Sequence, residues 1–168
     1  MDMYFSAKRQ TLEQFKAAYD RQRLNETPEG GSSVIFCAMA NQTPQNRYDI
    51  VKFLVGEGAV LTGVNSEGET LFHVLFSRPK HIIAQTAELT QLLIDAGADI
   101  NRLDAKSRVA IQHLISQPKL TDEELAPVYD IIFRSCTLDV STKNDWGYTP
   151  IELAQKLPYR ADLLKRMT

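Results

Sequence analysis

At four places in the chain a short polar segment leads into an apolar run, and this repetition is the feature that most constrains the fold. The position that most often holds threonine in the segment recurs at spacings of 37, 39 and 40 residues, at Ser33, Thr70, Val109 and Thr149. A second marker, a turn that closes a later apolar stretch, recurs at spacings of 39 and 40 residues, at Gly58, Gly97 and Thr137. Two markers with one period indicate a chain built from similar units.

The local chemistry of each unit predicts helices. Thr149 is suited to cap a helix that begins at Pro150, because proline at the first helical position loses no needed hydrogen bond and its fixed φ fits a helix. Later in the units, residues 50–54 and 89–94 place apolar side chains at i, i+3 and i+4, which marks one buried stripe. Each unit therefore has an apolar face that only a neighbouring unit can cover.

Three segments carry a family resemblance: residues 68–75 (GETLFHVL), 147–154 (GYTPIELA) and 92–101 (LLIDAGADIN). They resemble the ankyrin repeat, whose pattern reads G-x-T-P-L-H-x-A followed by L-L-x-x-G-A-D-x-N. The resemblance implies an all-α ankyrin-repeat solenoid of about four helix-turn-helix repeats, at approximately 29–65, 66–103, 104–143 and 144–168, which together form one structural domain over 29–168. The third repeat departs most, with Ser107, Val109 and Ala110 where the pattern has Gly, Thr and Pro.

Residues 1–28 precede the repeats, and we expect them to form an N-terminal capping helix and a linker. Leu12, Phe15, Ala18 and Tyr19 lie on one side of the expected helix, which would cover the first repeat with an amphipathic end. At the other end, residues 161–167 have the pattern of a short, basic final helix.

The units are longer than the roughly 33 residues of the family, so we expect lengthened inter-helix loops. Pro79 and Pro118 stop the first helix of their units, and Thr121 with Glu124 has the spacing of a capping box. We favour a structural extension of the outer layer as the purpose of these insertions. The alternative is a second contact surface, made by Arg78, Lys80, His81 and Lys119.

Composition and charge limit the classes of function. The chain has 168 residues, 43% of them hydrophobic, which suffices for a sizeable core. Its apolar runs are far too short for a membrane span, the first residues lack the apolar core of a secretion signal, and Cys37 and Cys136 are expected to be reduced thiols, so we expect a cytoplasmic protein. With 19 Lys and Arg against 21 Asp and Glu, the chain has no global positive field for nucleic acid.

A search for reactive groups predicts no catalytic residue, no metal site and no cofactor. His73 occupies the histidine of the family pattern, whose side chain links adjacent turns by hydrogen bonds in ankyrin proteins, so we expect a structural role. The histidines and cysteines show no metal-ligand spacing, and the chain has no phosphate-binding loop. An enzyme with a site in the groove, around His113, Cys37 and nearby carboxylates, is the less favoured alternative.

The ankyrin resemblance implies that a protein partner contacts the turn tips and the concave face of the first helices. Transferred by register, the predicted partner-binding residues are Glu67, Glu69, Arg78, Lys106, Arg108, Gln117, Asp145, Trp146, Tyr148 and Lys156. Trp146 is the only tryptophan, and with Tyr148 it has the character of an interface anchor. The alternative with similar weight is that Trp146 folds back on the Arg108 turn and only stiffens the array.

We therefore expect a protein-binding module that sequesters or inhibits a partner and is a monomer when free. In size and composition the chain is similar to small ankyrin proteins that act as bacterial immunity proteins, which occlude a cognate toxin. The alternative within the binding class is an adaptor or a host-directed ankyrin effector. A purely structural homo-oligomer is a third possibility, which the molecular mass in solution tests.

Overall fold

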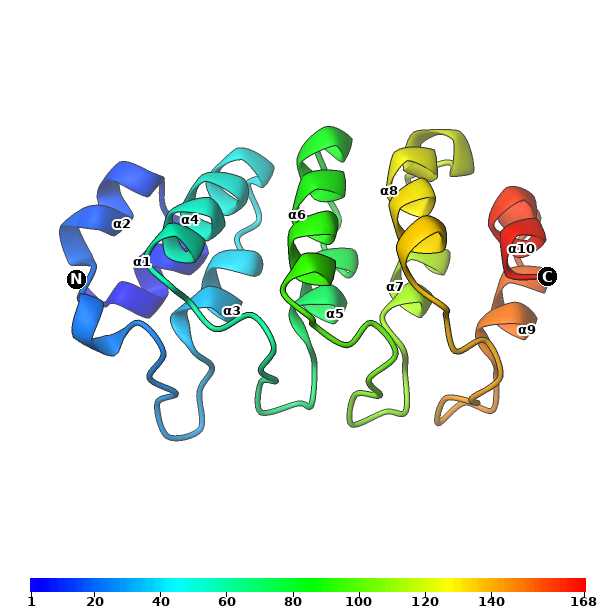
Figure 1. Cartoon of the computed structure of the whole chain (residues 1–168), viewed down its shortest axis with the longest axis horizontal. Helices are drawn as coiled ribbons and strands as arrows, with labels where there is room; N and C mark the ends of the chain where they lie inside the picture. Colours follow the sequence, from blue (N-terminus) through cyan, green and yellow to red (C-terminus); the bar gives the residue numbers. More distant parts are fainter.

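The computed structural model describes all residues 1–168 and is entirely helical, which confirms the all-α class (Figure 1). No helix of the structure combines the length and the apolarity that crossing a bilayer demands. Two short 3-10 helices, η1 and η2, accompany ten α-helices: α1 (Met3–Arg9), α2 (Leu12–Ala18), η1 (Arg21–Arg23), α3 (Val34–Met39), α4 (Pro44–Gly56), α5 (Leu71–Phe76), α6 (Ile83–Asp95), α7 (Ile111–Ile115), α8 (Asp122–Ser135), α9 (Pro150–Gln155), η2 (Pro158–Arg160) and α10 (Ala161–Met167).

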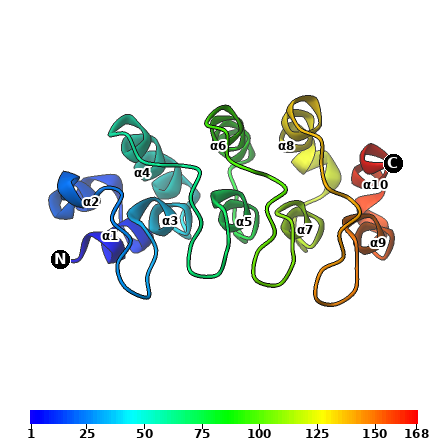
Figure 2. The ribbon, with the colours of Figure 1, turned by 60° about the horizontal axis from the view of Figure 1, so that its bottom comes forward.

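The helices form two parallel rows (Figure 2). The inner row consists of α1, α3, α5, α7 and α9, and the outer row of α2, α4, α6, α8 and α10; each helix contacts the next one in its own row. Long loops descend between successive units, and the two termini lie at opposite ends of the stack (Figure 1). The core fills the space between the rows, and every residue of α5 is buried.

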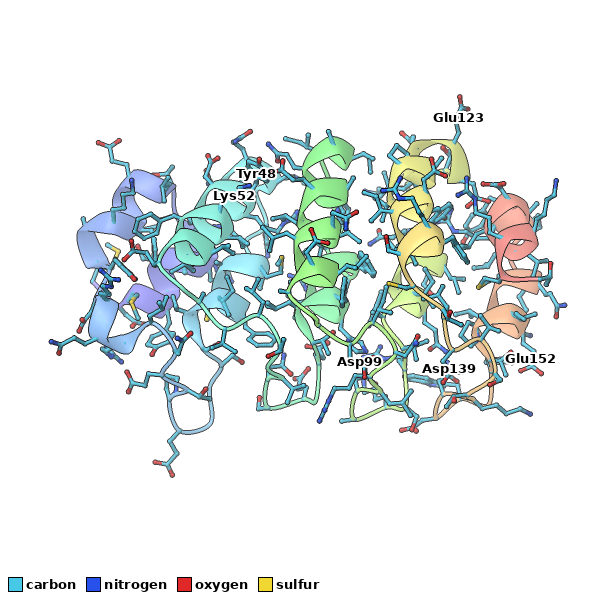
Figure 3. The ribbon with its side chains drawn as sticks, viewed as in Figure 1. Tyr48, Lys52, Asp99, Glu123, Asp139 and Glu152 are labelled. Carbon is cyan, nitrogen blue, oxygen red and sulfur yellow. The ribbon has the colours of Figure 1, made fainter.

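Local sequence explains where several helices begin. Thr149 accepts a hydrogen bond from the Glu152 N–H and α9 begins at Pro150, as predicted. Thr121 and Glu124 form the predicted capping box at the start of α8. In Figure 3, Tyr48 and Lys52 lie on α4 in the outer row, where both bind the carboxylate of Glu88 on α6, at 2.6 and 2.7 Å.

The N-terminal end differs from the sequence prediction. Where a single capping helix was predicted within residues 1–28, the structure has the helix pair α1 and α2, followed by η1. Asp2 caps α1 through its carboxylate, and Thr11 begins a new helix by forming a capping box with Gln14. The chain therefore turns at Gln10, and α1 packs against α3 as one more member of the inner row.

Buried polar side chains join the turns between the paired helices. Gln117 donates from Nε2 to the carbonyls of Phe76 and Arg78, both at 2.7 Å. Arg160, fully buried, donates to the carbonyls of Ile115, Gln117 and Leu120 and pairs with Asp122 at 3.2 Å. In the same way Asn41 binds the carbonyls of Ala7 and Gln10, and Arg78 binds that of Ala40. Each unit thus satisfies carbonyl groups of the unit before it.

The insertions therefore have a structural use. Arg78 and His81, two of the four residues of the alternative contact surface, are mostly buried and bonded within the chain, His81 to Arg78 O and to Thr86. Lys80 and Lys119 remain exposed. Gln117, predicted to bind a partner, is only 4% exposed, and its Nε2 donates to two backbone carbonyls, so this buried side chain does not belong to the partner-binding set.

Replacing Arg160 by leucine should lower the free energy of unfolding by about 3 kcal/mol, because three carbonyls lose a donor and the Asp122 carboxylate loses its cationic partner. Urea denaturation measures this loss. Arg166→Leu in the same segment is the control, since Arg166 pairs with two exposed carboxylates and its removal should cost at most about 1 kcal/mol. Equal losses in the two variants would contradict the structural role of Arg160.

Gly68→Ala should destabilise the protein more than Gly97→Ala. Both glycines have a positive φ, of 71° and 81°, where alanine is strained. Only at Gly68 would a Cβ also lie 3.3 Å from the backbone nitrogen of Ala105, whereas at Gly97 it would enter open space. The difference in thermal midpoint between the two variants measures the effect of the close contact between position 68 and the Ala105 backbone. Identical midpoints would contradict that effect.

Candidate functional site

Three loop tips are built by the same device. Asn65, Asp104 and Asn144 each accept backbone N–H groups from the residues two and four positions later, at 2.9–3.1 Å. A left-handed residue follows in each tip, Gly68, Ser107 or Gly147, and Ser107 adopts φ 58° despite its side chain. The tips are closed turns, with no β-strand in them.

Backbone and side-chain hydrogen bonds fix the tips relative to one another. The Ala105 N–H donates to Glu67 O at 3.0 Å, and the Asp145 N–H donates to Lys106 O at 3.1 Å. His73 Nδ1 accepts from the Thr70 N–H, so its Nε2 carries the proton and donates to Arg108 O at 2.8 Å. His73 thus links one unit to the next tip, as the resemblance implied. The tip residues form a row that the protein presents in a fixed geometry.

The tips and the inner row define one face of the molecule, here called the tip face. Hollows open on it at the seams between units. One lies between the Asn65 and Asp104 tips and is lined by Glu67, Glu69, Asp104, Ala105, Lys106 and Arg108. The next, between the Asp104 and Asn144 tips and here called the Trp146 hollow, is lined by Arg108, Gln112, His113, Ser116, Asn144, Trp146, Tyr148 and Leu153.

The structure places nine of the ten predicted partner-binding residues on or beside the tip face. Glu67, Lys106, Asp145, Trp146 and Lys156 are exposed, and Glu69, Arg78, Arg108 and Tyr148 are partly exposed. Four residues outside the predicted partner-binding set also line the Trp146 hollow: Gln112, Ser116, Asn144 and Leu153. Gln112 and Leu153 lie within the apolar runs of their units, where the pattern alone indicates core.

Trp146 combines the two roles that the sequence left open. Its side chain is 58% exposed, which suits an anchor. Its ring also has Lys106 Nζ at 5.6 Å and the Arg108 guanidinium at 5.8 Å, which is the stiffening contact. Lys156 Nζ lies 4.6 Å from the ring of Tyr148. The last tip therefore carries two aromatic rings, and cations from the preceding tip and from the end of α9 lie against them.

Burial and hydrogen bonds together set the charge states of the two titratable groups beside Arg108, which are Asp104 and His113. Burial alone would raise the pKa of the Asp104 carboxyl, but the N–H and guanidinium of Arg108, together with the Lys106 N–H, hold that pKa below its ordinary value. Arg108 Nε donates to Asp104 Oδ2 at 2.8 Å. Burial, helped by the positive charge of Arg108, lowers the pKa of His113 to about 4, so this imidazole is neutral at pH 7.

Glu69, Asp104 and His113 bring potential metal-ligand atoms within 4.8 Å of one another. Protein donors already hold both carboxylates: Asp104 is bound as described, and Glu69 Oε2 accepts from Asn65 Nδ2 at 2.8 Å. A cation at this point would have to displace the Arg108 guanidinium from Asp104. The cluster thus fits the closure of a tip better than a metal centre. Cys37, the other residue of the enzymatic alternative, lines a separate hollow with Lys8, Glu67 and Arg78.

The neutral, buried state of His113 predicts a pH-dependent stability. The unfolded imidazole takes up a proton near its ordinary pKa of about 6.5, whereas the folded one does so only near 4. The contribution of His113 is therefore complete above about pH 6.5 and decreases as the pH falls toward 4, by on the order of 3 kcal/mol. Urea denaturation of the wild type and of His113→Gln, repeated between pH 7 and pH 4, gives the free energy of unfolding at each pH. The difference in this free energy between the two proteins should shrink as the pH falls. A difference that stays constant over this range would contradict the assignment.

Comparison with known proteins supplies a fold relative without a function. No protein-family model matches the chain, and no curated protein matches it. Among solved structures, a functionally unknown protein from Leptotrichia buccalis C-1013-b is similar, with a TM-score of 0.86 and 26% sequence identity over 99% of this chain and 90% of that chain. The arrangement described above is therefore similar to one seen in an experimental structure.

Proposed function

We propose that the chain is an ankyrin-type repeat protein that binds another protein along its tip face and acts by covering a site on that partner. The pairing of a short inner helix with a longer outer helix in successive units, together with the repeated tip device, supports the ankyrin assignment. The single observation that carries the binding role is Trp146. A tryptophan 58% exposed at the end of a tip is held in place by two cations.

Because the tips are fixed before contact, binding on them costs little conformational entropy. The side chains of tip residues are presented by turns that are hydrogen-bonded to one another, so a partner orders few groups on contact. Exposed Trp, Tyr and Arg are the residue types that dominate measured interface energies. Occlusion is the action this arrangement supports, and occlusion of a toxin by an immunity protein is one form of it. An adaptor that joins two proteins is the alternative form, and we propose a monomeric free state for both.

The double change Trp146→Ala, Tyr148→Ala should weaken partner binding at least about tenfold, because hot-spot aromatics typically contribute about 2 kcal/mol or more. The partner is captured from the native cell lysate on immobilised protein, identified by mass spectrometry, purified, and titrated by calorimetry. The thermal midpoint should hardly change, since Trp146 lies outside the core. A fall in midpoint with unchanged affinity would assign both rings to the scaffold.

Two matched controls locate the surface. Tyr159→Ala removes an aromatic ring that is 48% exposed and lies in the turn before α10, away from the tips, and should leave the affinity unchanged. A photo-crosslinking side chain at Lys106 should capture the partner, whereas one at Glu123, in the first turn of α8 and on the side of the molecule opposite the tips, should not (Figure 3). Crosslinking from Glu123 alone would contradict the proposed face.

Inhibition of the purified partner's activity would separate occlusion from an adaptor role.

A further inference from the structure

The first of the four loop tips is built differently from the other three. It consists of residues 27–32 and is the first of the loops that descend between successive units in Figure 1. Thr27 stands three positions before the left-handed Gly30, where the other tips have Asn or Asp, and its side chain accepts no backbone N–H. The one hydrogen bond within the tip runs from the Gly31 N–H to Pro28 O, at 2.9 Å. The side-chain bonds that close the other tips are therefore missing here.

The first tip is also one residue longer than the others. In the next tip, the left-handed Gly68 comes two positions before Thr70, the residue that precedes the helix. In the first tip, Gly30 comes three positions before the corresponding Ser33. The additional residue is Gly31, and two adjacent glycines give the backbone more conformational freedom than any other pair of residues. The first tip therefore has slack that the other tips do not have.

The series of bonds between tips stops before the first tip. The Asp104 and Asn144 tips each donate one backbone N–H to the tip before them, from the residue that follows the Asp or Asn. The same position in the Asn65 tip is Ser66, whose N–H has no acceptor in the chain. Because the three tips share one backbone arrangement, the Ser66 N–H is directed toward the first tip, and Ser66 and Ser32 line one hollow between the two. The series thus ends in an unused donor.

Both ends of the first tip are fixed, although the tip itself is not. Before it, Asn25 Oδ1 accepts from the Val60 N–H at 2.9 Å. After it, Ser33 O accepts from the Phe36 N–H in the first turn of α3. Between these points, residues 27–32 form no hydrogen bond with the rest of the chain. The segment can therefore swing about its two ends without breaking a hydrogen bond, as is typical of the least stable parts of a structure.

We propose that the first tip is a strap that swings between an open position, which the structure shows, and a closed position in which Glu29 O accepts from the Ser66 N–H. Glu29 stands directly before the left-handed glycine of its tip, which is the place of the acceptor Glu67 in the next tip. Closure covers the hollow of about 230 Å³ that Cys37 and Ser32 help to line. A partner that contacts both tips favours the closed position. The motion belongs to the free chain and does not depend on the proposed function.

Engineered disulfides measure the closure directly. The two native cysteines are first replaced by serine, and each test protein then receives two new cysteines at exposed tip positions. Three pairs are compared, the strap pair, the bonded pair in the same register at the next seam, and a pair that skips one tip: Glu29→Cys with Ser66→Cys, Glu67→Cys with Ala105→Cys, and Glu29→Cys with Lys106→Cys.

The rates at which oxidised glutathione closes these disulfides decide the matter. We expect the strap pair to react at least about tenfold more slowly than the bonded pair, because only the closed position brings its sulfur atoms within the short span of a disulfide. It should also react at least about tenfold faster than the pair that skips one tip. A strap pair no faster than the skipping pair would overturn the closed position. A strap pair as fast as the bonded pair would overturn the open one.

A repaired tip tests the cause of the motion. Thr27→Asn combined with deletion of Gly31 gives the first tip the length and the asparagine of the Asn65 tip, so the strap should stay closed. Amide hydrogen exchange followed by NMR should then be at least about tenfold slower at Ser66 than in the wild type. Thr27→Asn alone keeps the additional glycine and is the matched control, which should leave the exchange rate unchanged. Exchange at Ser66 that is equally fast in the repaired protein would overturn the proposal.

Discussion

The fold depends on hydrogen bonds that each unit supplies to the carbonyl groups of its neighbour. Inner helices of five to seven residues are far below the length at which an isolated helix is stable in water, and most of their carbonyls lie in a last turn without an intrahelical partner. Asn41, Gln117 and Arg160 reach back to those carbonyls in the preceding unit. At the other end of the units, the N–H groups of Ala105 and Asp145 also reach back to the preceding tip, whereas His73 donates forward to a carbonyl of the following unit. Apolar packing holds the rows together, and these bonds fix the register between units.

Much of this architecture could be predicted because it repeats. The period located the helices, and the capping residues Thr121 and Thr149 located their first turns. The helix α1 was missed because its seven residues carry no repeat marker, and its cap at Asp2 is visible only once the chain is known to turn at Gln10.

Gln117 shows why part of the candidate site was misjudged. A polar side chain beside a proline has the pattern of an exposed loop, and its acceptors are carbonyls about 40 residues earlier, which no local pattern reveals. Asn41, Arg78 and Gln117 do recur at the unit spacing, so the sequence did contain a repeated polar position that could have indicated a shared structural role. Gln112 escaped notice for the opposite reason. It lies in an apolar run, and only the folded structure shows that Gln112 lines the Trp146 hollow and that its buried amide nitrogen has no acceptor.

The reach-back bonds make the turn of one unit depend on the order of the next. Asn41, Gln117 and Arg160 each donate to carbonyl groups of the unit before their own. Local opening of one unit therefore also exposes the turn of the unit before it to water. Because Arg160 belongs to the unit that displays Trp146, a partner bound at that tip also protects the turn that Arg160 closes in the preceding unit.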